Sequence, residues 1–271
     1  MSIIIKWLGT AGLEFTANGQ TLLIDPFISR PGKIKHLLFP LTPDEKVINN
    51  YLSGISGELK GVLIGHTHSD HVMDAPLLIK KFECNAYGTT SLANLLSAYN
   101  LEQHSVIVEY GKEINIGEFN VIPIKSKHGR VIFGKIPLEG EISKGLIPPL
   151  RVNKYREGGT IIWQICIGGK KYLHIGSADF IEENLKGFES DVLFICIVGR
   201  QNTKDFTKKI IDLVKPKIIV PIHFDDFFVP LTPNKVKYLS GVKINQFLDE
   251  IKVLAPNIDV IVPEPLKSML F

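Results

Sequence analysis

The chain has 271 residues, of which 45% are hydrophobic and 22% charged, and its formal net charge is +3. This composition is typical of water-soluble globular proteins, and the length is sufficient for a substantial core in one large or two small domains. The small net charge argues against a nucleic-acid-binding protein, and no stretch approaches the roughly 18 apolar residues that are needed to cross a bilayer.

Short apolar runs bounded by Gly, Pro, Asn or Asp recur through the first half of the chain and predict β-strands. The first run, Ile3–Leu8, is too short for the apolar core of a signal peptide, and no small-residue cleavage site follows it. Segments with helical periodicity separate the later runs. The expected strands are 3–8, 13–16, 21–24, 61–65, 106–109 and 119–124, and the expected helices are 43–52, 75–82 and 91–99.

The second half of the chain alternates strands with helices. Its expected strands are 160–167, 171–175, 191–198, 217–222 and 258–262, and its expected helices are 206–214, 234–239 and 244–254. Asp205 and Asn245 are expected caps or first-turn residues, whereas Gly54 and Gly241 are expected to end helices. Because helices must cover two sheet faces, this order predicts a layered α/β sandwich of two halves. No linker divides the chain, so residues 1–271 are expected to form a single domain.

Two long segments, 26–42 and 129–159, do not follow this pattern. Loops of such length often act as lids or binding loops, although some are plain insertions. The stretch Leu37–Phe39 in the first loop is open to two roles, lining an apolar pocket or touching lipid. The second loop contains three Glu residues and six basic residues, namely Arg130, Lys135, Lys144, Arg151, Lys154 and Arg156. If this loop lies over an active site it favours an anionic substrate; the alternative is a solvated basic loop.

The three cysteines, Cys84, Cys166 and Cys196, are widely spaced and form no Cys-x-x-Cys pair. Cys166 and Cys196 lie within apolar runs. This pattern indicates buried thiols rather than a disulfide framework or a metal site, and it predicts a reducing, cytoplasmic location.

The densest group of polar residues follows the expected strand 61–65 and comprises His66, His68, Asp70 and His71. Side chains alternate along an extended segment, so His66 and His68 share one side, while Asp70 and His71 can reach a second point. Imidazole nitrogen and carboxylate oxygen suit Zn²⁺, and also Fe²⁺ or Mn²⁺. A solvated His-rich turn is disfavoured, because buried polar groups without partners cost about 1–3 kcal/mol each. The sequence therefore predicts a metal site.

Further metal ligands must come from later in the chain. His128 and His223 each follow an apolar strand, and the ends of strands are where sites gather in α/β proteins. His174 lies within a strand, so it is open to a simple packing role. His36 and His104 are expected on the surface.

The order of these motifs resembles that of the metallo-β-lactamase fold superfamily over roughly residues 3–225. It consists of His-x-His-x-Asp-His, an isolated His after a strand, Gly-x-x-Asp after another strand, and Pro-x-His. Asp25 matches the family's early aspartate. The Gly9–Gly12 opening and the Leu-Ile-Asp-Pro sequence resemble the branch related to ascorbate-phosphate lactonases and N-acyl-phosphatidylethanolamine phospholipases. The resemblance implies a four-layer αββα sandwich.

The resemblance also implies a ligand set for one or two divalent ions, which are expected to be Zn, with Mn or Fe as alternatives. The first ion would be held by His66, His68 and His128, and the second by Asp70, His71 and His223. Asp25 would accept a hydrogen bond from a ligating imidazole.

The expected bridging carboxylate departs from the family pattern, which has Gly-Asp where this chain has Gly176-Ser177-Ala178-Asp179. Either the turn is bulged so that Asp179 bridges the two ions, or the second site is weakened. Asp225 and Asp226, just after His223, are alternative bridging residues.

The resemblance implies a hydrolase that uses a metal-bound hydroxide to cleave an ester-type bond, such as a phosphodiester or lactone. Asp70 would orient the nucleophile, and the substrate would be a small anionic or lipid-like molecule. A nucleic-acid phosphodiesterase is disfavoured by the weak net charge and the lack of an added RNA-gripping domain. A non-catalytic metal-binding protein is supported only by Ser177. No nucleic-acid partner and no stable membrane anchor are expected, and the oligomeric state is left open.

Overall fold

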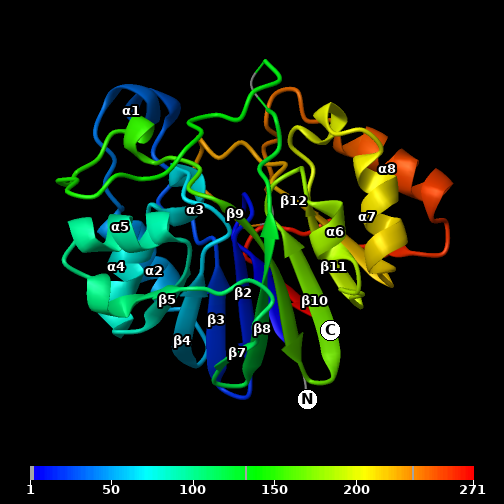
Figure 1. The fold of residues 1–271 in the computed structure, drawn as a ribbon, viewed down its shortest axis with the longest axis horizontal. Coiled ribbons are helices and arrows are strands. Elements are labelled where there is room, and N and C mark those ends of the chain that lie inside the picture. The colour runs from blue at the N-terminus through cyan, green and yellow to red at the C-terminus, as the bar shows by residue number, and fades with distance from the viewer. Residues whose placement is uncertain (1–2, 132, 234) are drawn as a thin grey trace.

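The structure, a computed structural model, describes residues 3–131, 133–233 and 235–271. Its centre consists of two seven-stranded sheets that pack face to face, with helices on the outer side of each sheet (Figure 1). The four-layer αββα sandwich expected from the sequence is therefore confirmed.

The first sheet has the strand order β14-β1-β2-β3-β4-β5-β6. Strands β1 to β3 form an antiparallel meander, and β4, β5 and β6 continue the sheet parallel to β3. The strands are β1 (Ile4–Trp7), β2 (Leu13–Ala17), β3 (Gln20–Ile24), β4 (Glu58–Leu63), β5 (Asn85–Gly88), β6 (Ser105–Ile107) and β14 (Ser268–Leu270). Because β3 and β4 are parallel, the residues that follow Ile24 and Leu63 lie at the same edge of this sheet.

The second sheet has the order β13-β12-β11-β10-β9-β8-β7. Strands β7 to β10 pair antiparallel, and β10 to β13 pair parallel. The strands are β7 (Ile114–Ile116), β8 (Phe119–Ser126), β9 (Thr160–Ile167), β10 (Lys170–Ile175), β11 (Val192–Cys196), β12 (Ile218–Ile222) and β13 (Asp259–Val260). In this register the C-terminal ends of β8, β10, β11 and β12 share one edge of the sheet.

The helices divide between the two outer faces (Figure 1). Those of the first half are α1 (Lys33–Leu38), α2 (Glu45–Leu52), α3 (Ser69–Val72), α4 (Ala75–Phe82) and α5 (Thr90–Ala98). Those of the second half are α6 (Glu182–Leu185), α7 (Phe206–Val214) and α8 (Ile244–Leu254). Short 3₁₀ turns occur at η1 (Glu102–His104), η2 (Val152–Lys154) and η3 (Arg200–Asn202). Within the described residues no helix combines the length and apolarity that a membrane crossing needs.

The main hydrophobic core lies between the two sheets. Phe15 of the first sheet packs edge-on against Tyr172 and Phe194 of the second, with ring centroids 5.4 and 5.9 Å apart. A second cluster lies between the first sheet and α4 and α5, and includes Leu23 and Leu78. Strands covered on both faces must be apolar on both faces, which explains why the sequence shows continuous apolar runs rather than alternation.

The elements with the strongest patterns form at the bounds expected from the sequence. These are β9 and the helices α4, α7 and α8. The short strands β5, β7 and β14 were not expected, because three or four residues carry little periodic signal. The prediction of a helix at 234–239 is wrong, because the described part of this segment is extended. Tyr238 forms a β-bridge with Asp225, and the Lys237 carbonyl accepts a hydrogen bond from the Asp226 N–H. Residue 234 lies outside the described residues.

Candidate metal centre

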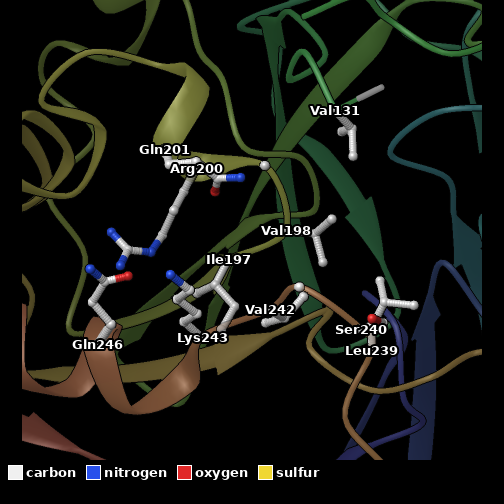
Figure 2. A pocket seen from close by; sticks show the side chains of 12 residues that line it. Val131, Ile197, Val198, Arg200, Gln201, Leu239, Ser240, Val242, Lys243 and Gln246 are labelled. Atoms are coloured by element: carbon white, nitrogen blue, oxygen red, sulfur yellow. The ribbon is translucent and has the colours of Figure 1, made fainter. Parts of the chain in front are cut away.

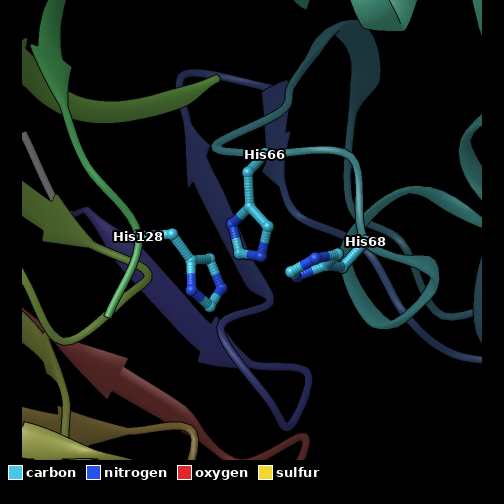
Figure 3. A group of neighbouring side chains, drawn as sticks. All are labelled: His66, His68 and His128. Carbon is cyan, nitrogen blue, oxygen red and sulfur yellow. The ribbon is translucent and has the colours of Figure 1, made fainter. Parts of the chain in front are cut away.

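Three histidines from both halves of the molecule meet at the edge where the sheets face each other. His66 and His68 follow β4 of the first sheet, and His128 follows β8 of the second. One ring nitrogen from each lies within 4.8 Å of the others, and Figure 3 shows the three rings converging. All three side chains are buried. The two halves of the sandwich therefore contribute jointly to this first group.

A second group consists of Asp70, His71 and His223, whose ligand atoms also lie within 4.8 Å of one another. Asp70 and His71 are placed by the short helix α3, and His223 directly follows β12. Asp70 Oδ2 lies 3.3 Å from His223 Nε2 and 3.9 Å from His71 Nε2. The groups adjoin, because the ring centroids of His66 and His71 are only 3.7 Å apart.

Backbone and carboxylate acceptors engage one nitrogen on several of these rings and leave the other for a ligand. His71 Nδ1 lies 2.9 Å from Asp25 Oδ2, His68 Nε2 lies 2.8 Å from the Pro137 carbonyl, and His128 Nδ1 lies 2.7 Å from the Gly129 carbonyl. Each acceptor requires the proton on that nitrogen, so the opposite nitrogen carries a lone pair.

His66 provides the clearest sign that a metal belongs here. Both of its ring nitrogens are buried and have no hydrogen-bond partner among the described residues. An unpaired buried polar atom is costly, and a metal ion would satisfy it. The nitrogen and oxygen donors of the two groups suit a divalent ion such as zinc. The residues present therefore fit the divalent ions that the resemblance to the metallo-β-lactamase fold superfamily implies.

Asp25 occupies the turn after β3, and its backbone has a left-handed φ of 43°. Its Oδ1 accepts from the Gly65 N–H at 2.6 Å while its Oδ2 faces His71. A Cβ at Gly65 would lie 2.8 Å from Asp25 Oδ2, so glycine is required where the ligand loop begins. Asp25 thus fixes both the His71 ring and the backbone before His66, in the contact that the sequence led us to expect.

Burial sets the protonation of the first group. It lowers the pKa of both His66 and His68, and the neighbouring histidines lower the pKa of His66 further. Burial and the adjacent His68 lower the pKa of His128 to about 3. These three rings are therefore neutral near neutral pH, which is the form that binds metal.

In the second group, neighbouring side chains shift the pKa values in the direction opposite to the effect of burial. Burial by itself raises the pKa of Asp70, but His71 and His223 hold it well below its usual range. Burial likewise lowers the pKa of His71, but Asp25 and Asp70 raise it above its ordinary value. Asp70 is therefore an ionised carboxylate facing two imidazoles.

The structure does not bring Asp179 into either group. Its Oδ1 accepts from the Phe180 N–H at 2.9 Å, and its Oδ2 lies 3.5 Å from Lys127 Nζ. In the turn after β10 the Asp179 carboxylate therefore faces its own backbone and Lys127, and Asp179 belongs to neither ligand group. Ser177 Oγ instead accepts from the Gly129 N–H at 3.0 Å and ties this turn to the segment after His128.

The two alternative bridging residues are also engaged elsewhere. Asp225 pairs with the buried Arg30 at 2.6 Å and accepts from the Thr10 N–H at 2.8 Å, whereas Asp226 pairs with Lys237 at 2.9 Å. The Thr10 carbonyl in turn accepts from the His223 N–H at 2.7 Å. Asp225 and Arg30 thus help to hold the backbone of the candidate ligand His223, and neither belongs to a ligand group. The sequence did not reveal this role.

The remaining histidines divide between packing and support. His174 is buried in β10, with Nε2 2.7 Å from the Ala11 carbonyl, which agrees with a packing role. His104 is half-buried. The expectation that His36 lies on the surface is wrong, because its side chain is buried. Its Nε2 lies 3.2 Å from the Oγ of Ser69, the residue between the candidate ligands His68 and Asp70 in the chain. A helix as short as α1 gives too little periodicity to identify its buried face.

The 129–159 segment packs directly on the ligand loop. The Thr67 N–H donates to the Glu157 carbonyl at 2.9 Å, and Thr67 Oγ1 donates to the Arg156 carbonyl at 2.6 Å. Gly158 has a φ of 72°, and a Cβ there would lie 2.3 Å from Thr67 Oγ1. The basic side chains of the segment are exposed. This loop therefore packs on the ligand loop and exposes its basic side chains to solvent.

A cavity of about 400 Å³ lies beside the centre, between the end of β11 and the start of α8 (Figure 2). Arg200 and Lys243 contribute its positive charge, and Val131 and Leu239 are among its apolar residues. The Leu239 N–H donates to the Phe224 carbonyl, next to His223. None of the six candidate ligands lines this cavity, so the converging side chains, and not the cavity, locate the chemistry.

Comparison with known proteins agrees with this geometry. The Beta-lactamase superfamily domain matches residues 4–223, a range that contains both ligand groups. The chain belongs to the beta-lactamase superfamily. The enzyme class expected from the sequence, a metallo-β-lactamase fold metal-dependent hydrolase, is confirmed at the level of the family.

Relatives of this superfamily protein bear corresponding names. It is 25% identical over 263 residues to a UPF0173 metal-dependent hydrolase of Carboxydothermus hydrogenoformans, covering 96% of each chain. A protein of the same name from Metallosphaera sedula is 28% identical over 246 residues, covering 88% of this chain and 91% of that one.

Solved structures share the fold of this superfamily protein. The metallo hydrolase Igni18 of Ignicoccus hospitalis has a TM-score of 0.68 at 17% identity and covers 100% of this chain and 99% of that one. The diiron β-hydroxylase CmlA of Streptomyces venezuelae has a TM-score of 0.64 at 14% identity, with 99% of this chain matching 54% of that one.

Proposed function

We propose that this beta-lactamase superfamily protein hydrolyses an ester-type bond, such as a phosphodiester or lactone, in a small anionic or lipid-like molecule. The observation that carries the proposal is the pair of adjoining ligand groups in one buried centre. The names of the relatives, metal-dependent hydrolases, support the same reaction class.

In this proposal His66, His68 and His128 hold one divalent ion and Asp70, His71 and His223 hold a second. The proposed metal is zinc, and Mn or Fe would suit the same nitrogen and oxygen donors. When bound, such ions lower the pKa of water and polarise the bond under attack. Among the described residues of the two groups, Asp70 is the only carboxylate, so the proposal does without a bridge from Asp179.

The protein's own residues prepare the site for this reaction. Asp70 is ionised, and its very low pKa makes it a weak base, so its proposed role is to orient the attacking water by accepting a hydrogen bond. Asp25 fixes the His71 ring, and the Pro137 carbonyl fixes the His68 ring. Rigid ligands of this kind reduce the reorganisation needed during the reaction.

The basic side of the 129–159 segment supports an anionic substrate. Arg151, Lys154 and Arg156 are exposed, and they lie on the segment that contacts the ligand loop at Thr67. Positive charge beside a buried centre raises the local concentration of anions and steers them toward it.

Two further features of the proposal concern the whole chain. The sheets share one core, which supports a single domain. The cysteines are free and Cys84 and Cys196 are buried, which supports a reducing cytoplasmic location.

The test combines elemental analysis of the purified protein with a hydrolysis screen of phosphodiesters, lactones and thioesters. We expect one or two equivalents of a divalent metal and turnover of at least one ester class, lost on chelation and restored by the metal. Bound metal without turnover of any ester would favour a non-catalytic metal-binding protein. Turnover confined to RNA or DNA would favour the nucleic-acid phosphodiesterase.

A further inference from the structure

The outer face of α1 is an apolar surface next to the metal centre. Ile34, Leu37, Leu38 and Phe39 are 71%, 53%, 61% and 55% exposed. We call these four residues the α1 patch. Positions 34, 37 and 38 share one face of a helix, because residues three and four apart are neighbours. A cluster of large exposed apolar side chains within six residues marks an interaction site more often than isolated ones do.

The inner face of α1 fixes its position relative to the ligands. His36 Nε2 lies 3.2 Å from Ser69 Oγ, and the His36 ring packs against the Phe227 and Phe228 rings at 6.3 and 5.3 Å. Phe227 lies 6.0 Å from the His223 ring. Figure 1 shows α1 at the same end of the sheets as α3. The α1 patch therefore faces outward from a helix whose other side rests on the metal centre.

Basic residues border this surface. Lys33 and Lys35 are exposed on α1, and the exposed Arg151 donates to the Leu38 carbonyl at 2.9 Å. Residues 26–43 contain no Asp or Glu. The next acidic residue, Asp44, is occupied in capping α2, where it accepts from two backbone N–H groups. The border of the patch is therefore positively charged.

We propose that the α1 patch docks on a lipid surface that carries anionic headgroups. Apolar side chains flanked by lysine and arginine are the composition of segments that lie in the membrane interface, where the apolar groups enter the acyl boundary and the cations contact headgroups. Lysine is depleted from protein–protein interfaces, which makes a protein partner a poorer match. Docking would bring α1, whose inner face contacts the ligand loop at Ser69, against the lipid surface.

The test is cosedimentation of the full chain with vesicles of phosphatidylcholine mixed with phosphatidylglycerol, compared with phosphatidylcholine alone. We expect binding to the mixed vesicles that weakens at high salt. The triple variant Leu37→Ser, Leu38→Ser, Phe39→Ser should lose at least about tenfold in vesicle affinity, because three apolar side chains no longer enter the bilayer. The pair Lys33→Glu, Lys35→Glu should weaken binding to the mixed vesicles only.

Controls separate this surface from general stickiness and from the hydrolase assignment. Ile107→Ser and Val253→Ser remove exposed apolar side chains elsewhere and should leave vesicle binding unchanged. His68→Ala should also bind vesicles like the wild type, so docking is tested independently of hydrolysis. Wild-type affinity in the triple variant would overturn the proposal. A wild-type chain that ignores vesicles but self-associates through the patch would overturn it in favour of a second copy.

Discussion

Single residues support the metal centre without touching a metal. Asp25 joins the His71 ring to the Gly65 backbone, and Asp225 joins Arg30 to the Thr10 backbone that holds His223. Both carboxylates are buried. Their partners are fixed groups, so each carboxylate restricts the position of a candidate ligand.

The Asp25→Asn variant should weaken metal binding about 10–100-fold, the range typical when a group that orients a metal-binding histidine is lost. Asparagine keeps an acceptor for the Gly65 N–H but no longer provides the carboxylate that faces His71 Nδ1. Titration against a competing chelator measures the affinity. Asp212→Asn, an exposed aspartate paired with Lys208, is the matched control. Equal affinities in both variants would contradict the role of Asp25.

His68 is a direct test of the first group. His68→Ala should abolish metal bound there and hydrolysis of a model ester while the fold is retained, because the alanine removes one of three donors. Metal content by elemental analysis and far-ultraviolet circular dichroism measure the two effects. His104→Ala, outside both groups, should keep its metal. An unchanged metal content in the His68 variant would refute the assignment.

Asp74 is a buried carboxyl that we expect to make stability depend on pH. Its Oδ2 accepts from the Ile28 and Ser29 N–H groups, but burial dominates and raises the pKa of Asp74 to about 6. The folded chain therefore binds more protons than the unfolded chain between about pH 4 and about pH 6. This contribution to stability is fully present below the unfolded pKa and is lost as the pH rises through about 6.

The Asp74→Asn variant isolates this effect. Relative to it, the wild type should lose about 3 kcal/mol of unfolding free energy between about pH 4 and about pH 7.5, which is roughly two pKa units at about 1.4 kcal/mol each. Urea unfolding of both proteins at each pH gives the difference, and contributions from other groups cancel. A difference that does not vary with pH would contradict the raised pKa.

At the scale of elements, the long segments 26–42 and 129–159 contact each other next to the metal centre. Leu41 of the first pairs with Leu150 of the second, and the second packs on Thr67 in the ligand loop. These contacts show why neither segment follows a regular pattern: each is shaped by its partner and by the centre that both adjoin.

The triple variant Arg151→Gln, Lys154→Gln, Arg156→Gln should raise KM for anionic esters several-fold and KM for neutral esters less. Only the anionic esters lose their attraction to the three cationic side chains. Steady-state kinetics with a matched pair of esters measures the ratio. Lys208→Gln, Lys209→Gln and Lys252→Gln remove equal charge at exposed positions elsewhere. Equal effects on both ester types would remove the case for a steering role.

At the scale of the whole molecule, the centre links the two sheets. His66 and His68 extend from the first sheet, and His128 and His223 extend from the second. A metal held between them would bind the folded chain and not the unfolded one, which stabilises the fold by mass action.

Removal of metal with a chelator should therefore lower Tm by about 5–10 °C, since metal at about 100 times Kd contributes about 2.7 kcal/mol, and 1 kcal/mol corresponds to about 2–4 °C at this size. Differential scanning calorimetry before and after chelation measures the change, and added metal should restore it. The same Tm in both states would contradict a metal that joins the sheets.

The sequence by itself predicted a layered α/β sandwich, its strongest elements and the cluster from His66 to His71. Continuous apolar runs follow from strands buried on both faces, and the cluster from His66 to His71 is local enough to be read directly. Their places at strand ends made His128 and His223 credible further ligands, and the resemblance to the metallo-β-lactamase fold superfamily assigned them to the two groups.

Only the tertiary structure decided where Asp179 points, that His36 is buried, and that Arg30 and Asp225 hold His223. The Asp179 carboxylate is directed by a single turn, and the other contacts join segments far apart in the chain. Sequence patterns report local periodicity, whereas these contacts depend on the packing of loops against a completed core.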